Sequence, residues 1–188
     1  MRQLQLLGFF AMIFAFVACG QSSQKDSKTE EIKIETPEKW KVLNESDYSI
    51  QYPDTFDLDK SGQMGMSFIL LSKQTSQQDL FRENVNLLIQ DLTGQNIDLD
   101  KYVEISEGQI KTMITDGNLI ESKRLTDKNK EFQRVIYTGK QGQFDLKWQQ
   151  FYWVVNKKAY VLTLTCEINQ YDNYVSVGEE IMKTFMIK

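Results

Sequence analysis

The chain has 188 residues, of which 41% are hydrophobic and 26% are charged, a composition typical of a folded protein with one domain. Its formal charge of -4 argues against a nucleic-acid partner, because a phosphate-binding surface needs clustered Lys and Arg. The absence of histidine excludes Ser-His-Asp and Cys-His catalysis and histidine-ligated zinc, and two cysteines are too few for a disulfide framework.

The N-terminus has the organisation of an export signal. Arg2 precedes an uncharged apolar run at 6–18. A helix needs about 20 residues to span a bilayer, so this run is too short for a permanent anchor but suits a signal peptide that is removed.

The last residues of this run, Phe16-Val17-Ala18-Cys19, resemble the lipobox of bacterial lipoproteins, with Phe16 where Leu is usual. The resemblance implies cleavage before Cys19 and attachment to a membrane through acyl chains on its thiol. Gly20, rather than Asp, follows the cysteine, which by the same resemblance favours the outer membrane and leaves its side open. A plain cleaved signal with an incidental cysteine is the alternative.

Composition changes again after the cysteine. Residues 20–36 are rich in Ser, Gln, Lys and Glu and predict a solvated linker that ends near Pro37. We therefore expect a lipoprotein signal peptide at 1–18, the lipidated cysteine with its flexible linker at 19–37, and a globular domain at 38–188.

Alternation of apolar and polar residues from Trp40 onward predicts strands. The segments 40–44 and 48–52 form a hairpin, and Pro53 ends its second strand. The segments 66–71 and 84–92 are more continuously apolar and predict buried strands.

The period then becomes helical from Leu99 to Ile114, with Asp98 expected as the N-cap and Gly117 as the stop. The strands 118–125 and 131–138 follow as a second hairpin.

Two further strands and a helix complete the domain. In the strand 144–155 the apolar phase shifts near Gln149, which predicts a bulge there. The strand 159–168 places Thr163 and Thr165 on a face that we expect to be exposed or lightly covered. A helix at 171–185 ends the chain.

These elements predict an α+β domain with a mostly antiparallel sheet of six to eight strands flanked by helices. Their order, together with the segment Tyr48-Ser49-Ile50-Gln51-Tyr52-Pro53-Asp54-Thr55-Phe56, resembles the PsbP-like family over about residues 38–186, with Phe56 where Trp is common. The resemblance implies an α/β/α sandwich that binds or assembles rather than catalyses, and lipidation points to the DcrB-like envelope lipoproteins. It supplies no catalytic residue.

Few residues are candidates for chemistry. Cys166 lies on the apolar phase of its strand, which predicts a buried, inert thiol. The pairs Asp57/Asp59 and Asp98/Asp100 do not continue into a calcium-binding loop, so we expect no metal site and no cofactor.

The densest aromatic cluster contains Trp148, Phe151, Tyr152 and Trp153. If they were exposed together, Trp148, Tyr152 and Trp153 could contact a glycan or a partner protein. We expect core positions instead, because burial of large aromatic side chains is a main source of stability in a small domain.

The sequence therefore predicts a non-enzymatic, lipid-anchored envelope protein that binds an unidentified envelope protein or supports an envelope complex. The alternative is a carrier or binding protein for an apolar ligand or glycan. A hydrolase that uses carboxylates alone ranks third, because two acids about 5–10 Å apart would have to meet in one pocket.

Overall fold

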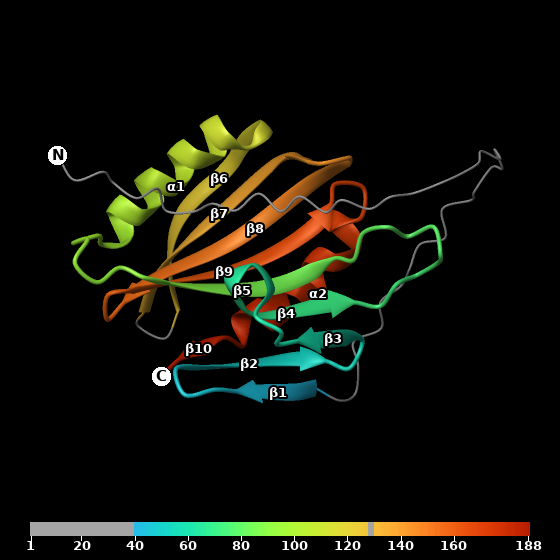
Figure 1. Ribbon diagram of the computed structural model, residues 1–188, viewed down its shortest axis with the longest axis horizontal. Helices are drawn as coiled ribbons and strands as arrows, with labels where there is room; N and C mark the ends of the chain where they lie inside the picture. The colour runs from blue at the N-terminus through green and yellow to red at the C-terminus, as the bar shows by residue number, and fades with distance from the viewer. Residues whose placement is uncertain (1–39, 128–129) are drawn as a thin grey trace.

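The computed structural model describes residues 40–127 and 130–188, which form two α-helices and ten strands (Figure 1). In chain order the elements are β1 (Trp40–Asn44), β2 (Tyr48–Pro53), β3 (Phe56–Asp59), a short 3-10 turn (Gln63–Gly65), β4 (Met66–Ser72), β5 (Asn84–Asp91), α1 (Leu99–Met113), β6 (Thr115–Asp127), β7 (Lys130–Gln141), β8 (Phe144–Val155), β9 (Lys158–Glu167), α2 (Tyr171–Lys183) and β10 (Met186–Ile187).

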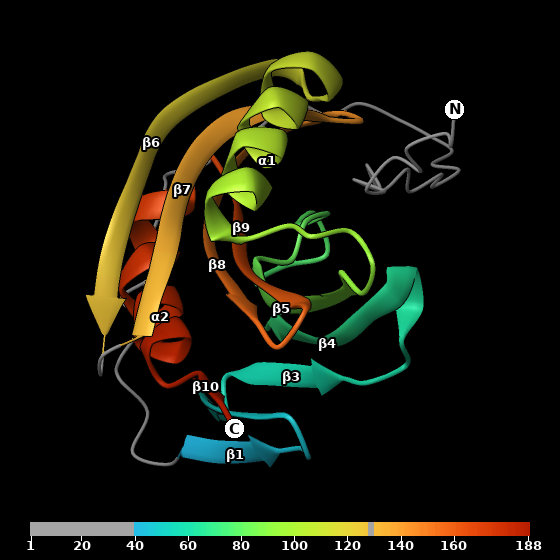
Figure 2. The ribbon, with the colours of Figure 1, turned by 90° about the vertical axis from the view of Figure 1, so that its left-hand side faces the viewer.

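The strands form two antiparallel sheets. The larger one has the order β3-β4-β5-β9-β8-β7-β6, and β1-β2-β10 form the smaller one. Figure 2 shows that the large sheet is strongly curved and carries α1 on one face and α2 on the other. The predicted α+β class, with helices on both faces of a mostly antiparallel sheet, is confirmed.

The two faces of the large sheet are covered differently. On the α2 face, α2 and the small sheet enclose a core that includes Ile50, Leu87, Leu162 and Ile181. On the other face, α1 packs on β6, β7 and β8 around Tyr102 and other buried side chains. The α2 face therefore holds the larger continuous core.

Helix α1 begins as predicted and ends earlier than predicted. The Asp98 side chain accepts a hydrogen bond from the Lys101 amide, which confirms the N-cap. The helix ends at Met113 and not near Gly117, which lies within β6. A Cβ at position 117 would be 2.2 Å from the Ile110 carbonyl oxygen. The glycine is needed for this close approach rather than for a helix stop.

The predicted bulge at Gln149 is wrong. The register of β8 is continuous with β7 from Phe144 to Tyr152 and with β9 from Leu146 to Val155. The apolar phase appears to slip in the sequence because both faces of this central strand are buried. The expectation of a lightly covered face on β9 is wrong for the same reason, since Thr163 and Thr165 are each only 6% exposed.

Two short strands were not predicted. The four residues of β3 include Asp57 and Asp59, so the strand lacks a clear apolar pattern, and β10 has only two residues. Its pairing with β2 and the contact between Thr184 and the Gln51 backbone attach the chain's C-terminal end to the small sheet.

Within residues 40–127 and 130–188, neither helix has both the length and the hydropathy to cross a bilayer.

Candidate functional site

The aromatic side chains of β8 are divided between the two faces of the sheet. On the α1 face, Trp148 stacks on Tyr137 with ring centroids 4.9 Å apart, and Tyr152 meets Tyr102 of α1 edge-on at 5.5 Å. Trp153 belongs to the core of the opposite face. Trp148, Tyr152 and Trp153 are 7%, 1% and 8% exposed. Their burial supports core positions and leaves no shared aromatic surface on which a glycan or partner could stack.

Polar side chains run beneath and beside α1 on the same face. The Tyr152 hydroxyl donates to Gln150, whose Nε2 donates to the Thr163 hydroxyl at 3.1 Å. The Tyr102 hydroxyl donates to Gln90 of β5. The Tyr102–Gln90 bond joins α1 to the sheet, and the other two bonds satisfy polar groups between β8 and β9, so we assign all three a structural role.

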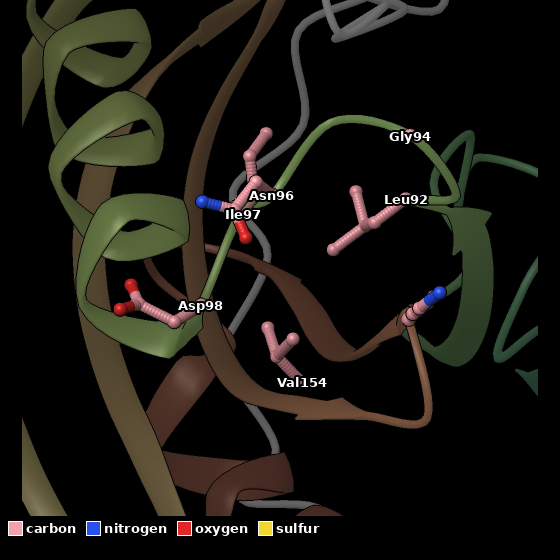
Figure 3. A pocket seen from close by; sticks show the side chains of 7 residues that line it. Leu92, Gly94, Asn96, Ile97, Asp98 and Val154 are labelled. Atoms are coloured by element: carbon pink, nitrogen blue, oxygen red, sulfur yellow. The ribbon is translucent and has the colours of Figure 1, made fainter.

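A pocket of about 390 Å³ opens on the α1 side, between the β5–α1 connection and the β8–β9 turn (Figure 3). It is lined by Leu92, Gly94, Asn96, Ile97, Asp98, Val154 and Lys157. Asp98 already accepts the Lys101 amide as the N-cap, at 2.8 Å. The lining combines an apolar floor with a few polar groups, an arrangement that suits a small ligand better than a reaction.

The carboxylates considered as calcium ligands have other roles. Asp57 lies 2.6 Å from both Lys73 and Arg82, and these hydrogen bonds lower the pKa of its carboxyl. Asp100 pairs with Arg124 at the start of α1. Among the described residues, no group of three or more Cys, Asp or Glu side chains is arranged to hold a metal ion.

Cys166 is fully buried on the α2 face, as predicted. Burial is the main cause of the raised pKa of its thiol, with the nearby Glu83 carboxyl as a further cause. The thiol therefore stays protonated at neutral pH and is a poor nucleophile.

Glu83 is a buried acid that the sequence analysis missed. It is 3% exposed, and burial raises the pKa of its carboxyl to about 7. The Ser72 hydroxyl lies 3.4 Å from Oε2, whereas Oε1 has no hydrogen-bond partner among the described residues. The available signal was its position two residues before Val85, which places it on the apolar phase of β5.

Three connections, β4–β5, β7–β8 and β9–α2, lie at the end of the large sheet at which β4 and β9 finish (Figure 1). Leu80, in the β4–β5 connection, is 68% exposed, and Ile168, after β9, is 47% exposed. The rings of Phe81 and Phe144 are 5.2 Å apart, and the Ile168 amide donates to the Asp145 carbonyl at 3.0 Å. We call the surface formed by Leu80, Phe81, Phe144 and Ile168 the loop end.

Only a weak indication of the loop end is present in the sequence. Leu80-Phe81 interrupts the polar segment 73–82, yet no pattern links this pair to Phe144 or Ile168 before the sheet order is known. Cys19, the predicted lipidation site, lies outside the described residues.

No protein-family model matches the sequence, and the comparison with curated proteins finds no match. Several solved structures are similar. Cyanobacterial PsbP (CyanoP) from Synechocystis sp. PCC 6803 has a TM-score of 0.54 at 12% identity, covering 79% of this chain and 92% of that one. PA94 from Pseudomonas aeruginosa, described as a putative regulator of unknown function, has a TM-score of 0.56 at 12% identity, covering 79% and 97%.

LpqN of Mycobacterium tuberculosis, described as involved in cell envelope biogenesis, has a TM-score of 0.60 at 13% identity, covering 80% of this chain and 91% of that one. At such identities the likeness concerns the fold alone. The domain has a PsbP-like fold, as the resemblance in its sequence implied.

Proposed function

We propose that this chain is a lipid-anchored protein of the bacterial cell envelope whose PsbP-like domain binds a protein partner and catalyses no reaction. The observation that carries the proposal is the loop end, where Leu80 and Ile168 expose aliphatic side chains at the same end of the sheet as the half-buried Phe81 and Phe144. Apolar side chains grouped on a surface and rimmed by polar residues are typical of a protein-binding site.

The placement of the reactive groups supports the same proposal. The Cys166 thiol is buried with a raised pKa, and burial also raises the pKa of the Tyr171 hydroxyl to about 12. Asp57 and Asp100 are engaged in ion pairs, and Asp98 caps α1. Each of these groups has a structural role that accounts for its position.

The proposed localisation, at the outer membrane, rests on Cys19 and on the linker at 20–37. The similarity to LpqN, a protein involved in cell envelope biogenesis, agrees with an envelope role. Two or three acyl chains on one cysteine would hold the domain stably at a bilayer surface, because a single chain binds only marginally.

Membrane attachment through Cys19 is tested with a Cys19→Ala precursor in the native cell. We expect this variant to lose acyl incorporation and to leave the membrane fraction. Membrane attachment equal to that of the wild type would refute lipid anchoring at Cys19.

Partner binding is tested by crosslinking in intact cells that express the wild-type chain, followed by mass spectrometry. We expect one protein to be recovered reproducibly from the membrane-attached form. Repeated recovery of no partner would count against a binding module.

The pocket favours a second candidate function, a carrier for a small ligand. Its volume of about 390 Å³ and the side chains of Leu92, Ile97 and Val154 suit a compact, partly apolar molecule. A Val154→Trp variant should fill the pocket. If the domain is a carrier, the wild type should copurify with a small molecule that this variant lacks, as mass spectrometry of the extracted protein would show.

A further inference from the structure

We infer that the loop end binds a cationic segment of the partner protein, in which Lys or Arg side chains flank apolar residues. This inference rests on the proposed function and adds the chemistry of the partner. It is carried by three features of the loop end, namely its exposed aliphatic side chains, the carboxylates around them and a buried acid beneath.

The aliphatic side chains are available for contact. Leu80 is 68% exposed and directly precedes Phe81 of the ring pair Phe81–Phe144, and Ile168, which follows β9, is 47% exposed. The backbone bond from the Ile168 amide to the Asp145 carbonyl joins the segment after β9 to the start of β8. Apolar side chains supported in this way form a small preorganised surface, which reduces the entropy lost on binding.

The carboxylates around this surface form no ion pair within the described residues, although Lys140, which pairs with Asp116 at 2.9 Å, lies near enough to Asp145 for their charges to interact. Asp79, Asp145 and Glu167 have no Lys or Arg within ion-pair distance among the described residues. The Asp79 carboxylate accepts hydrogen bonds from the amide and hydroxyl of Thr75, at 2.9 and 2.8 Å. The rim is therefore acidic.

The basic side chains of this region are already engaged. Lys73 and Arg82 both pair with Asp57 at 2.6 Å. The Lys147 ammonium lies 3.7 Å from the centre of the Tyr171 ring. The acidic rim would therefore have to obtain its counter-charge from another molecule.

The buried acid is Glu83, whose Oε1 has no hydrogen-bond partner although the residue is only 3% exposed. The pKa of the Glu83 carboxyl is raised to about 7, with burial as the main cause and the charges of Asp79 and Glu167 as further causes. Asp79 also raises the pKa of Glu167, after burial as the main cause. A cationic side chain brought to the loop end would relieve this mutual repulsion.

A bilayer is a poorer occupant of the same surface. Envelope membranes rich in anionic headgroups repel an acidic rim, whereas they attract basic segments. Opposite charges placed around an apolar centre instead favour association with a basic protein surface and make it dependent on salt.

The test uses the full-length, membrane-attached chain in its own cells. A photocrosslinking amino acid replaces Leu80 or Ile168, and in a matched control it replaces Val42, which is 62% exposed on the small sheet. We expect positions 80 and 168, but not 42, to capture the same protein. The crosslinked peptide of that protein should carry Lys or Arg beside apolar residues.

A charge reversal then tests the role of the rim. Asp145→Lys should lower the crosslinking yield from position 80 by about fivefold, and the yield should also fall as salt is raised. Glu180→Lys, an equal reversal at an exposed position of α2, should leave the yield unchanged. Thermal unfolding of each variant shows whether it is folded.

The other outcomes distinguish failure of the cationic-segment inference from failure of the proposed partner binding. A crosslink from position 80 to an acidic or uncharged segment, or to lipid, would overturn the cationic partner. So would an undiminished yield in folded Asp145→Lys. Capture of one protein from position 42 alone would show that the partner binds elsewhere, which would contradict the loop-end surface but agree with the proposed function. No capture from any of the three positions would count against both the loop-end surface and the proposed function.

Discussion

At the scale of single residues, the buried carboxyl of Glu83 is costly to the fold. A carboxyl group that is buried without full hydrogen bonding prefers its neutral form, so its pKa rises from the ordinary 4.5 to about 7. The nearby Cys166 thiol is buried as well, and it is protonated throughout the neutral range.

Stability should therefore depend on pH through Glu83. Between pH 4.5 and about 7 the folded protein keeps a proton that the unfolded chain has lost, so this group's contribution to stability falls as pH rises. The loss amounts to about 3 kcal/mol once pH exceeds the folded pKa. Glu83→Gln should lack this decline, as urea unfolding at pH 5 and pH 8 would show.

The matched control for that experiment is Glu180→Gln, because Glu180 is exposed on α2. This variant should keep the pH dependence of the wild type. An equal decline in Glu83→Gln and in the wild type would mean that another group causes it.

The β8–β9 turn contains a second costly residue. Asn156 and Lys157 both have positive φ, 52° and 60°, as a two-residue type I′ turn requires, and glycine is favoured at the second of these positions. Lys157→Gly should raise the free energy of unfolding by about 1 kcal/mol, because it removes the clash of a Cβ in the left-handed region. Asn156→Gly should change it less, since Asn tolerates that region. An unaltered or lowered stability in Lys157→Gly would contradict this account of the turn.

At the scale of elements, the sequence predicted every strand and helix that has a clear apolar period. The hairpin of β1 and β2, the buried strands β4 and β5, and the Asp98 cap of α1 are all confirmed. It failed where the pattern depends on three-dimensional packing. Full burial of β8 on both faces looks like a bulge in the sequence, and Gly117 looks like a helix stop.

The packing of α2 on the sheet provides a test at this scale. A Cβ at Gly178 would lie 2.7 and 2.8 Å from the two methyl carbons of Leu164 on β9. Gly178→Ala should therefore lower the free energy of unfolding by about 1–3 kcal/mol, because helix and sheet would have to separate slightly. Urea unfolding monitored by circular dichroism measures this change.

Gly108 supplies the matched control. It lies within α1, where an added Cβ would meet nothing within 4 Å. Gly108→Ala should raise the free energy of unfolding by up to about 1 kcal/mol, since alanine restricts the unfolded chain and favours the helix. If both variants shifted stability in the same direction, close packing of α2 would not be the cause.

At the scale of the whole molecule, the PsbP-like fold has one strongly curved sheet whose two faces are covered by different helices (Figure 2). The two ends of this sheet also differ. One end carries the pocket beside Lys157, and the other carries the exposed Leu80 and Ile168. The sequence predicted the α/β/α sandwich and lipidation at Cys19, but not the loop end. That surface exists only because the sheet places the β4–β5 connection, which is distant in the sequence, next to the start of β8 and the end of β9.

The central claim, that the domain holds a protein partner at its loop end, is tested most directly by amide hydrogen exchange. Exchange would be compared between the chain in its native membranes and the chain purified in detergent without partners. We predict slower exchange in the native membranes for 73–83 and 168–170, and equal exchange at the β8–β9 turn. Equal exchange at the loop end in both samples, or protection confined to the pocket, would contradict the claim.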